Sequence, residues 1–454
     1  MKHFFRFLVI TILAWPARAV LAIEPNDNTP WLEKRLDWFQ DQKFGLLMHW
    51  GSYSQLGCDA SWPIVPGTDS GPAHEQFVRD YVASIKTFNP TRFNPDNWAR
   101  IAKDAGMKYV VFTTKHHDGF CMFDTRQTSY RITAPDVPFH ENAHSNVVRE
   151  VFQSFRNQGL GIGAYFSKAD WHSPYYWNPN WPVHANTVNY DTHEHPDLWS
   201  NFVAYTQAQI KELVTGYGPI DILWLDAGWV RSPDEDIQMA TLATTARQYQ
   251  PHLIIVDRTV GGEYENYRTP EQEVPDQPLP YPWETCMTMG TQWSYKPDDQ
   301  YKSTFQLIHL LVDIVGKGGN FLLNVGPQPD GELPPVAVQR MKEIGKWLKL
   351  NGPAIYGTRP IAPYKDDQVV YSQNNNTVYA TYLPQGENDR LPARVFLAGL
   401  KPVAGSEIHL LGVKGAFQWK TLANGTTAIY IPEKIRNAPP CHDAFVFEFH
   451  SIRS

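Results

Sequence analysis

Two carboxyl residues next to apolar runs are the first candidates for chemistry in this chain. Asp226 closes the run Ile222 to Leu225, where an unpaired carboxylate is costly unless its oxygens reach an opening. Glu284 begins the strand-like run ETCMTM beside Trp283, whose ring can raise a carboxyl pKa toward neutrality. Glycoside hydrolysis commonly uses one carboxylate at the anomeric carbon and one proton-delivering carboxyl, roughly 5 Å apart in retaining enzymes. We therefore expect Asp226 as nucleophile and Glu284 as acid/base.

The sequence leaves other arrangements of the carboxylates open. Asp226 could be locked in an ion pair with Arg258, which ends the next apolar run. Glu271 and Glu273 lie in the segment TPEQEVP between the two candidate strands, and could reach the same site or be solvated charges. We favour Glu284 because it belongs to a strand-like run, and we keep Glu271 and Glu273 as alternatives.

Three histidines invite a metal interpretation. His49 ends the run FGLLMHW, and His116 and His117 follow the run YVVFTTK. Imidazoles at strand ends are common zinc ligands, but the HEXXH pattern is absent, and a barrel metal site normally gathers several carboxylates. We therefore expect no metal at these histidines.

A sugar site accounts for the same histidines better. Ring nitrogens hydrogen-bond hydroxyl groups, and aromatic faces cover the C–H surface of a sugar ring. Adjacent residues of a strand point to opposite faces, so we expect one of His116 and His117 to support the other from behind. The aromatic candidates are Trp62, Tyr165 and Trp224.

The elements that position these residues alternate between strands and helices. Apolar runs that close on polar groups are typical of parallel strands buried on both faces. Such runs cover 44–50, 109–120, 160–170, 220–228, 253–258 and 320–327. Apolar residues at three- and four-residue spacing predict helices over 95–106, 146–159 and 198–218. The alternation predicts a (β/α) TIM-like barrel, whose site lies at the carboxyl ends of the strands.

A second type of pattern begins after Gly352. Short alternating runs separated by Asn, Gly, Pro or charged turns predict an antiparallel β-sandwich. The preceding helix stops at Asn351-Gly352-Pro353, a C-terminal stop signal. We therefore expect a catalytic barrel over 23–355 and a sandwich domain over 356–454. The sandwich lacks a cluster of aromatic residues at its loop tips, so we expect it to pack on the barrel.

The N-terminus and the charge balance indicate the compartment and the type of partner. Residues 1–22 contain Lys2, Arg6, an apolar stretch and small residues at possible cleavage sites, the pattern of a signal peptide. The apolar stretch is too short for a membrane anchor. Removal of the segment takes the formal charge from −7 to −10, which argues against nucleic acid or anionic lipid and favours a neutral substrate. We expect a periplasmic or secreted protein with four free, mostly buried cysteines.

Several long blocks resemble glycoside hydrolase family 29, the α-L-fucosidases. They follow the family order over about 38–360 and cover the expected barrel. The blocks are WFQDQKFGLLMHWGSYS, FNPTRFNPDNWARIAKDAGMKYVVFTTKHHDGFCMFDT, GAYFSKADW, QIKELVTGYGPIDILWLDAG, PWETCMTM and GKGGNFLLNVGPQPDGELP.

The resemblance implies a retaining double displacement on an α-L-fucosyl unit, without a cofactor. Asp226 of the WxD block would attack C1, and Glu284 of the WE block would protonate the leaving oxygen and then act as base. It also implies a set of sugar-binding residues, namely His49, His116, His117, Tyr165, Trp224 and Arg258.

Two features of the chain depart from the family pattern. Many members carry a Glu-Trp pair after the HWG block, whereas residues 57–81 contain none, and Trp62 or Glu75 could substitute. The acid/base position also varies among members, which keeps Glu271 and Glu273 open. The expected protein is an exo-acting hydrolase of terminal fucose on a glycan. The alternatives are a related α-L-glycosidase such as an α-L-galactosidase, or a fucose-binding lectin without activity, and an oligomer is possible.

Overall fold

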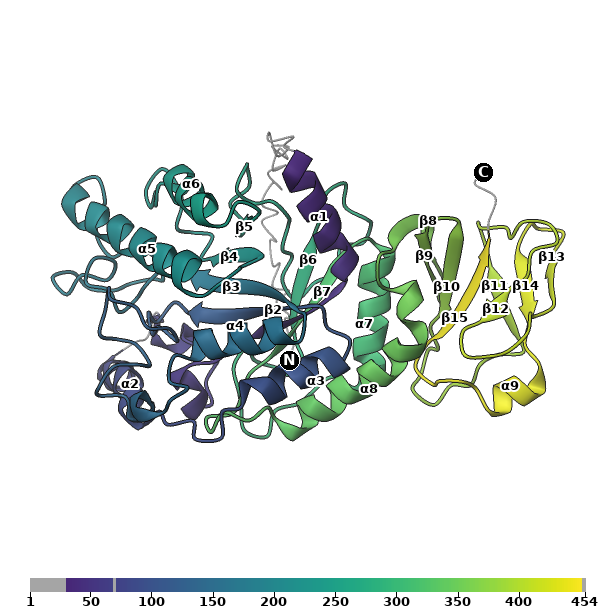
Figure 1. Cartoon of the computed structure of the whole chain (residues 1–454), viewed down its shortest axis with the longest axis horizontal. Helices are drawn as coiled ribbons and strands as arrows, with labels where there is room; N and C mark the ends of the chain where they lie inside the picture. The colour runs from purple at the N-terminus through teal and green to yellow at the C-terminus, as the bar shows by residue number, and fades with distance from the viewer. Residues whose placement is uncertain (1–29, 68–70, 451–454) are drawn as a thin grey trace, which may run out of the picture.

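Seven parallel strands form a curled sheet in the larger part of the molecule (Figure 1). The computed structural model describes residues 30–67 and 71–450, so the signal peptide predicted at residues 1–22 lies outside the described residues. The strand order is β5-β4-β3-β2-β1-β7-β6. Their bounds are β1 Phe44–Met48, β2 Tyr109–Lys115, β3 Gly161–Ser167, β4 Ile222–Asp226, β5 Ile254–Asp257, β6 Glu284–Thr288 and β7 Asn320–Val325.

Helices cover the outside of this sheet (Figure 1). Three of them agree with the predicted helices to within two residues at each end. Local chemistry explains the starts of two helices: Asn94 accepts a hydrogen bond from the backbone of Asn97 at the start of α3, and Ser303 forms a capping box with Gln306 at the start of α7. The bounds are α1 Pro30–Gln42, α2 Pro72–Ala83, α3 Pro95–Asp104, α4 Val147–Asn157, α5 Pro196–Gly216, α6 Met239–Tyr249, α7 Thr304–Gly316 and α8 Pro335–Asn351.

Residues 264–272, here called the seam segment, span the gap between the two edge strands. On one side the backbone N–H of Asn266 donates to the carbonyl of Ile255 in β5, at 3.0 Å. On the other side the N–H of Glu284 in β6 donates to the carbonyl of Arg268, at 2.8 Å. The described chain therefore completes its barrel with an irregular segment instead of a regular eighth strand.

An antiparallel β-sandwich follows the barrel, as the alternating runs predict. Its two sheets have the orders β12-β15-β10-β9-β8 and β11-β14-β13, and apolar residues of both sheets share one core. A short helix, α9 Glu433–Asn437, lies beside it. The strands are β8 Arg359–Asp366, β9 Val369–Asn374, β10 Thr377–Tyr382, β11 Arg394–Leu397, β12 His409–Leu410, β13 Trp419–Thr421, β14 Thr427–Tyr430 and β15 Phe445–His450.

The sandwich packs against α7 and α8 (Figure 1). The indole of Trp347 in α8 donates to the carbonyl of Ala444 at 3.0 Å, and His309 of α7 hydrogen-bonds the carbonyl of Asp443 at 2.9 Å. The hydroxyl of Ser372 in β9 donates to the carbonyl of Ala354, at 2.8 Å. These contacts agree with the expectation that the sandwich packs on the barrel.

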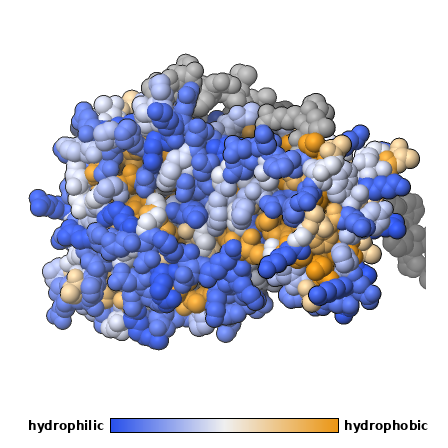
Figure 2. All heavy atoms as spheres, turned by 45° about the vertical axis from the view of Figure 1, so that its right-hand side comes forward, coloured by the Kyte–Doolittle hydropathy of each residue, from blue (hydrophilic) through white to orange (hydrophobic). Residues whose placement is uncertain are grey.

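Hydrophilic residues cover most of the molecular face in Figure 2, and hydrophobic residues gather in separate areas. None of the helices in the described part of the chain is long and apolar enough to cross a membrane. All four cysteines are free thiols, and Cys121 and Cys286 are buried, as the sequence predicts. The predicted possibility of an oligomer stays a prediction.

Candidate active site

A cavity of about 210 Å³ opens among the loops that follow the parallel strands. Its size is below the roughly 300–1,000 Å³ of pockets for drug-sized ligands, which favours a single small group such as one sugar ring. All of its lining residues come from the barrel part of the described chain. They are Leu47, His49, Trp62, His116, His117, Tyr165, Trp224, Asp226, Gly228, Trp229, Arg258, Thr259, Glu271, Cys286 and Trp293.

Asp226 is the last residue of β4 and places both carboxylate oxygens among polar groups. Arg258 Nη1 donates to Oδ1 at 2.8 Å, and the hydroxyl of Tyr165 donates to Oδ2 at 2.5 Å. His117 Nε2 lies 3.7 Å from the same Oδ2. The two interpretations of Asp226 from the sequence, an ion pair with Arg258 and a site residue, are therefore both correct in geometry. The residue forms the ion pair and also lines the cavity.

The charge of Asp226 is stabilised despite burial. Burial alone would raise the pKa of this carboxyl group. The guanidinium of Arg258 acts in the opposite direction, and His117 and the hydroxyl of Tyr165 add to its effect, so the pKa of Asp226 is well below its usual value. Asp226 is thus ionised at neutral pH, which is the state that a nucleophile needs.

Glu271 is the second carboxylate in the cavity wall. It lies on the seam segment, and Arg258 Nη2 donates to its Oε2. Since Nη1 and Nη2 of Arg258 branch from one carbon, Asp226 and Glu271 lie within the span of one guanidinium group. That spacing is compatible with the roughly 5 Å between the carboxyl groups of retaining glycosidases.

Glu284 occupies a different place from the one expected of an acid/base. It is the first residue of β6, so it lies at the opposite end of the strands from Asp226, is fully buried and does not line the cavity. Three groups donate hydrogen bonds to its carboxyl group: the hydroxyls of Tyr109 and Tyr267, at 2.5 and 3.2 Å, and the indole of Trp224, at 3.1 Å. Burial raises its pKa to about 7. Of the three acid/base candidates, only Glu271 lines the cavity.

All three predicted histidines line the cavity. His116 and His117 do so together, with ring centroids 4.2 Å apart, against the expectation that they point to opposite faces. The physical reason is that β2 ends at Lys115, so the two histidines lie in the turn that follows. Gly119 shapes this turn: its φ is +79°, and a Cβ there would lie 2.2 Å from Asp170 Oδ1.

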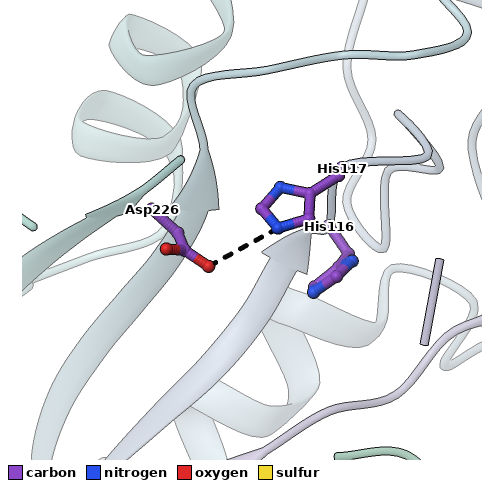
Figure 3. A group of neighbouring side chains, drawn as sticks. All are labelled: His116, His117 and Asp226. Atoms are coloured by element: carbon purple, nitrogen blue, oxygen red, sulfur yellow. Dashed lines mark ion pairs between the residues drawn. The ribbon is translucent and has the colours of Figure 1, made fainter. Parts of the chain in front are cut away.

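Figure 3 shows His116, His117 and Asp226. Each offers one atom that could ligate a metal, an imidazole nitrogen or a carboxylate oxygen, and these atoms all lie within 4.8 Å of one another. Such a group could hold a metal ion by residue type. However, Arg258 is 2.8 Å from Asp226, so a cation here would meet the guanidinium charge at short range. The donor set therefore fits a polar organic ligand better than a metal ion.

Aromatic rings form the rest of the wall. Tyr165 and Trp224 stack at 5.3 Å, and the half-exposed Trp62 lies edge-on to His117, at 5.2 Å between centroids. Trp229 and Trp293 also line the cavity, and sequence reasoning missed both. Trp229 lies three residues after Asp226, a proximity that could have indicated it. Glu75 pairs with Arg79 on the exposed side of α2, and only Trp62 of the two suggested substitutes reaches the cavity.

The sequence profile of the alpha-L-fucosidase family matches residues 21–353, a range that contains the whole parallel sheet and the cavity lining. The chain belongs to the alpha-L-fucosidase family. Tissue alpha-L-fucosidase of Mus musculus is 31% identical over 428 residues, covering 88% of this chain and 89% of that protein. The Homo sapiens tissue alpha-L-fucosidase is 28% identical over 441 residues, covering 92% and 89%.

Solved structures of alpha-L-fucosidases have the same fold. Alpha-L-fucosidase isoenzyme 1 from Paenibacillus thiaminolyticus has a TM-score of 0.77 and 30% identity, covering 93% of this chain and 100% of that chain. Thermotoga maritima alpha-fucosidase in complex with fucose has a TM-score of 0.73 and 25% identity, covering 94% and 99%. The predicted fold class and the predicted enzyme class, an alpha-L-fucosidase among glycoside hydrolases, are confirmed.

Proposed function

We propose that this alpha-L-fucosidase removes a terminal α-L-fucosyl residue from a glycan with retention of configuration. Asp226 attacks C1 of the fucosyl unit, and Glu271 protonates the leaving oxygen and then activates water. The observation that carries this assignment is the position of Arg258, which binds Asp226 and Glu271 in one small cavity. Glu284 cannot take the second role without leaving its three buried hydrogen-bond donors.

The cavity geometry supports exo action. Its volume suits one sugar ring, and the half-exposed Trp62 and the neighbouring Trp229 form part of its wall. The rest of the glycan would extend outward past these rings. The complexed fucose in the Thermotoga maritima structure, at 25% identity, supports fucose as the sugar in this cavity.

The roles of the carboxyl groups are tested with an aryl α-L-fucoside and azide. We expect Asp226→Ala to lose turnover by at least roughly a thousandfold and to form β-fucosyl azide when azide is added. Glu271→Ala should still release a good aryl leaving group and form α-fucosyl azide, because azide then attacks the covalent intermediate without a general base. Glu284→Ala should form no fucosyl azide.

The same assay separates the alternatives. Azide rescue in Glu284→Ala and not in Glu271→Ala would return the acid/base role to Glu284. Faster turnover of the aryl α-L-galactoside than of the fucoside would favour the related glycosidase, since one C6 hydroxyl separates the two sugars. Loss of wild-type activity in a chelator would contradict the metal-free mechanism.

We further propose that residues 1–22 are a cleaved signal peptide and that the enzyme acts in the periplasm or outside the cell. The basic start, apolar stretch and small residues of this segment support the proposal. N-terminal sequencing of the protein from its native host should find a mature chain that begins near residue 20 or 23. A full-length chain in the cytoplasm would contradict it.

A further inference from the structure

Each cavity histidine uses Nδ1 for a hydrogen bond to a residue behind the cavity wall. His49 bonds Asn324 Oδ1 at 2.8 Å, and His117 bonds Ser167 Oγ at 2.6 Å. Burial lowers the pKa of both imidazoles to about 4, so at neutral pH each ring carries one proton. One nitrogen of each ring is therefore a donor and the other an acceptor, and the partner behind the wall decides which is which.

The direction of the hydrogen bond between His117 and Ser167 is fixed by a second contact of Ser167. The hydroxyl of Ser167 has one hydrogen, and it lies 2.7 Å from the carbonyl oxygen of Ala169, which can only accept. Ser167 Oγ must therefore accept from His117 Nδ1–H. The lone pair of His117 then lies on Nε2, the atom that faces Asp226 (Figure 3).

The side-chain amide of Asn324 fixes the direction of its hydrogen bond with His49. The Nδ2 of Asn324 donates to the carbonyl oxygen of Trp293 at 2.6 Å, which places its Oδ1 toward His49. An amide oxygen only accepts, so His49 Nδ1 carries the proton and Nε2 the lone pair. His116 differs, because its Nδ1 partner, Ser61 Oγ at 2.5 Å, has no carbonyl contact that fixes its hydrogen among the described residues.

We propose that Ser167 and Asn324 are positioning residues that hold His117 and His49 with their Nε2 lone pairs available to the sugar. The tautomers follow from the contacts alone, whereas the recognition of fucosyl hydroxyls rests on the proposed function. Each lone pair accepts one hydroxyl hydrogen. The sugar must therefore present two hydroxyl donors in the right places, and a deoxy sugar leaves a buried acceptor unpaired.

The assigned tautomer has a consequence for the contact between His117 and Asp226. With a bare Nε2, the imidazole and the carboxylate face each other as two acceptors 3.7 Å apart. A hydroxyl hydrogen placed beside them relieves the repulsion. In this tautomer His117 donates no hydrogen bond to Asp226, whose oxygens accept from Arg258 and Tyr165.

The tautomers can be measured directly by long-range proton–nitrogen NMR correlations on the enzyme labelled with ¹⁵N-histidine. The chain has 16 histidines, so His49→Gln and His117→Gln serve for assignment. We expect both rings to carry the proton on Nδ1 at pH 7. Ser167→Ala should convert His117 to a tautomer mixture and leave His49 unchanged, and Asn324→Ala should do the reverse. A proton on Nε2 of either ring in the wild type would overturn the inference.

A binding experiment tests the consequence for the sugar. Inhibition constants of fucose and its monodeoxy derivatives are measured on the wild type, Ser167→Ala and the matched control Ser61→Ala. We expect one deoxy derivative to bind the wild type roughly 10- to 100-fold more weakly than fucose, and this ratio to shrink in Ser167→Ala. An unchanged ratio in Ser167→Ala overturns the positioning role. If the tautomers are as proposed but fucosides are not hydrolysed, the proposed function fails and the tautomer assignment stands.

Discussion

At the scale of single residues, one cation, Arg258, forms ion pairs with both carboxylates of the cavity. Arg258 lies under both Asp226 and Glu271, and its carbon is 4.6 Å from the centre of the Trp224 ring. Ala227 and Thr259, which follow Asp226 and Arg258, both have left-handed φ angles of 70° and 60°. A β-branched residue rarely adopts this conformation, and such strain is common where a site requires a sharp turn.

Replacement of Arg258 should change the pH dependence of activity. Without the guanidinium, burial raises the pKa of Asp226, so a larger fraction is protonated at acidic pH. The acidic limb of kcat/KM for Arg258→Met should therefore move upward by about one pH unit or more. The check is a pH profile of aryl fucoside hydrolysis, with Arg268→Met as control because Arg268 does not line the cavity. An unmoved limb would show that Arg258 does not set the charge of Asp226.

At the scale of elements, the seam segment joins the site to the barrel interior. Tyr267 of this segment hydrogen-bonds Glu284, and its ring stacks on Phe39 at 4.0 Å. Glu284 also accepts hydrogen bonds from the indole of Trp224 in β4 and from the hydroxyl of Tyr109 in β2. A single buried carboxyl group thus links two strands and the segment that carries Glu271.

The raised pKa of Glu284 predicts how stability depends on pH. Its folded pKa of about 7 exceeds the ordinary value of 4.5, so the unfolded chain loses this proton first as the pH rises. The free energy of unfolding should fall between pH 4.5 and 7, by on the order of 3 kcal/mol for this group.

Glu284→Gln should remove that fall, as measured by urea unfolding at several pH values. The exposed Glu273→Gln is the control for a substitution in the same part of the chain. An unaltered pH dependence of the free energy of unfolding in Glu284→Gln would contradict this prediction.

At the scale of the whole molecule, the sandwich contacts the barrel through closely packed helices. Gly316, the last residue of α7, allows this approach, because a Cβ there would lie 2.3 Å from Val370 Cγ1 of β9. Gly216, the last residue of α5, is a matched control position, because a Cβ there would have no atom within 4 Å.

The pair provides a test of the interface. Gly316→Ala should lower the free energy of unfolding by roughly 1–3 kcal/mol, because the added methyl group overpacks the contact. Gly216→Ala should raise it by roughly 0.5–1 kcal/mol, because alanine loses less entropy in a helix. Calorimetry and urea unfolding measure both, and KM should stay unchanged in both. Equal effects of the two substitutions would show that the helix and not the interface governs the result.

The sequence by itself indicated most strands of the parallel sheet, four of the helices around it, the sandwich pattern and the candidate site residues that follow strands. Asp226 and the histidines could be found because a buried apolar run that closes on polar groups is a local signal. The bounds of the predicted helices and strands were accurate to a few residues, because the periodicity of apolar residues is also a local signal.

Only the tertiary structure places Glu271 in the cavity wall and Glu284 at the opposite end of the strands. The strand-like run around Glu284 indicates that the residue is buried, but not which end of the barrel it lies at. The seam segment has no strand pattern, so its return to the cavity beside Arg258 depends on long-range pairing with β5 and β6. The same holds for the orientation of His49 and His117, which Asn324 and Ser167 set from distant parts of the chain.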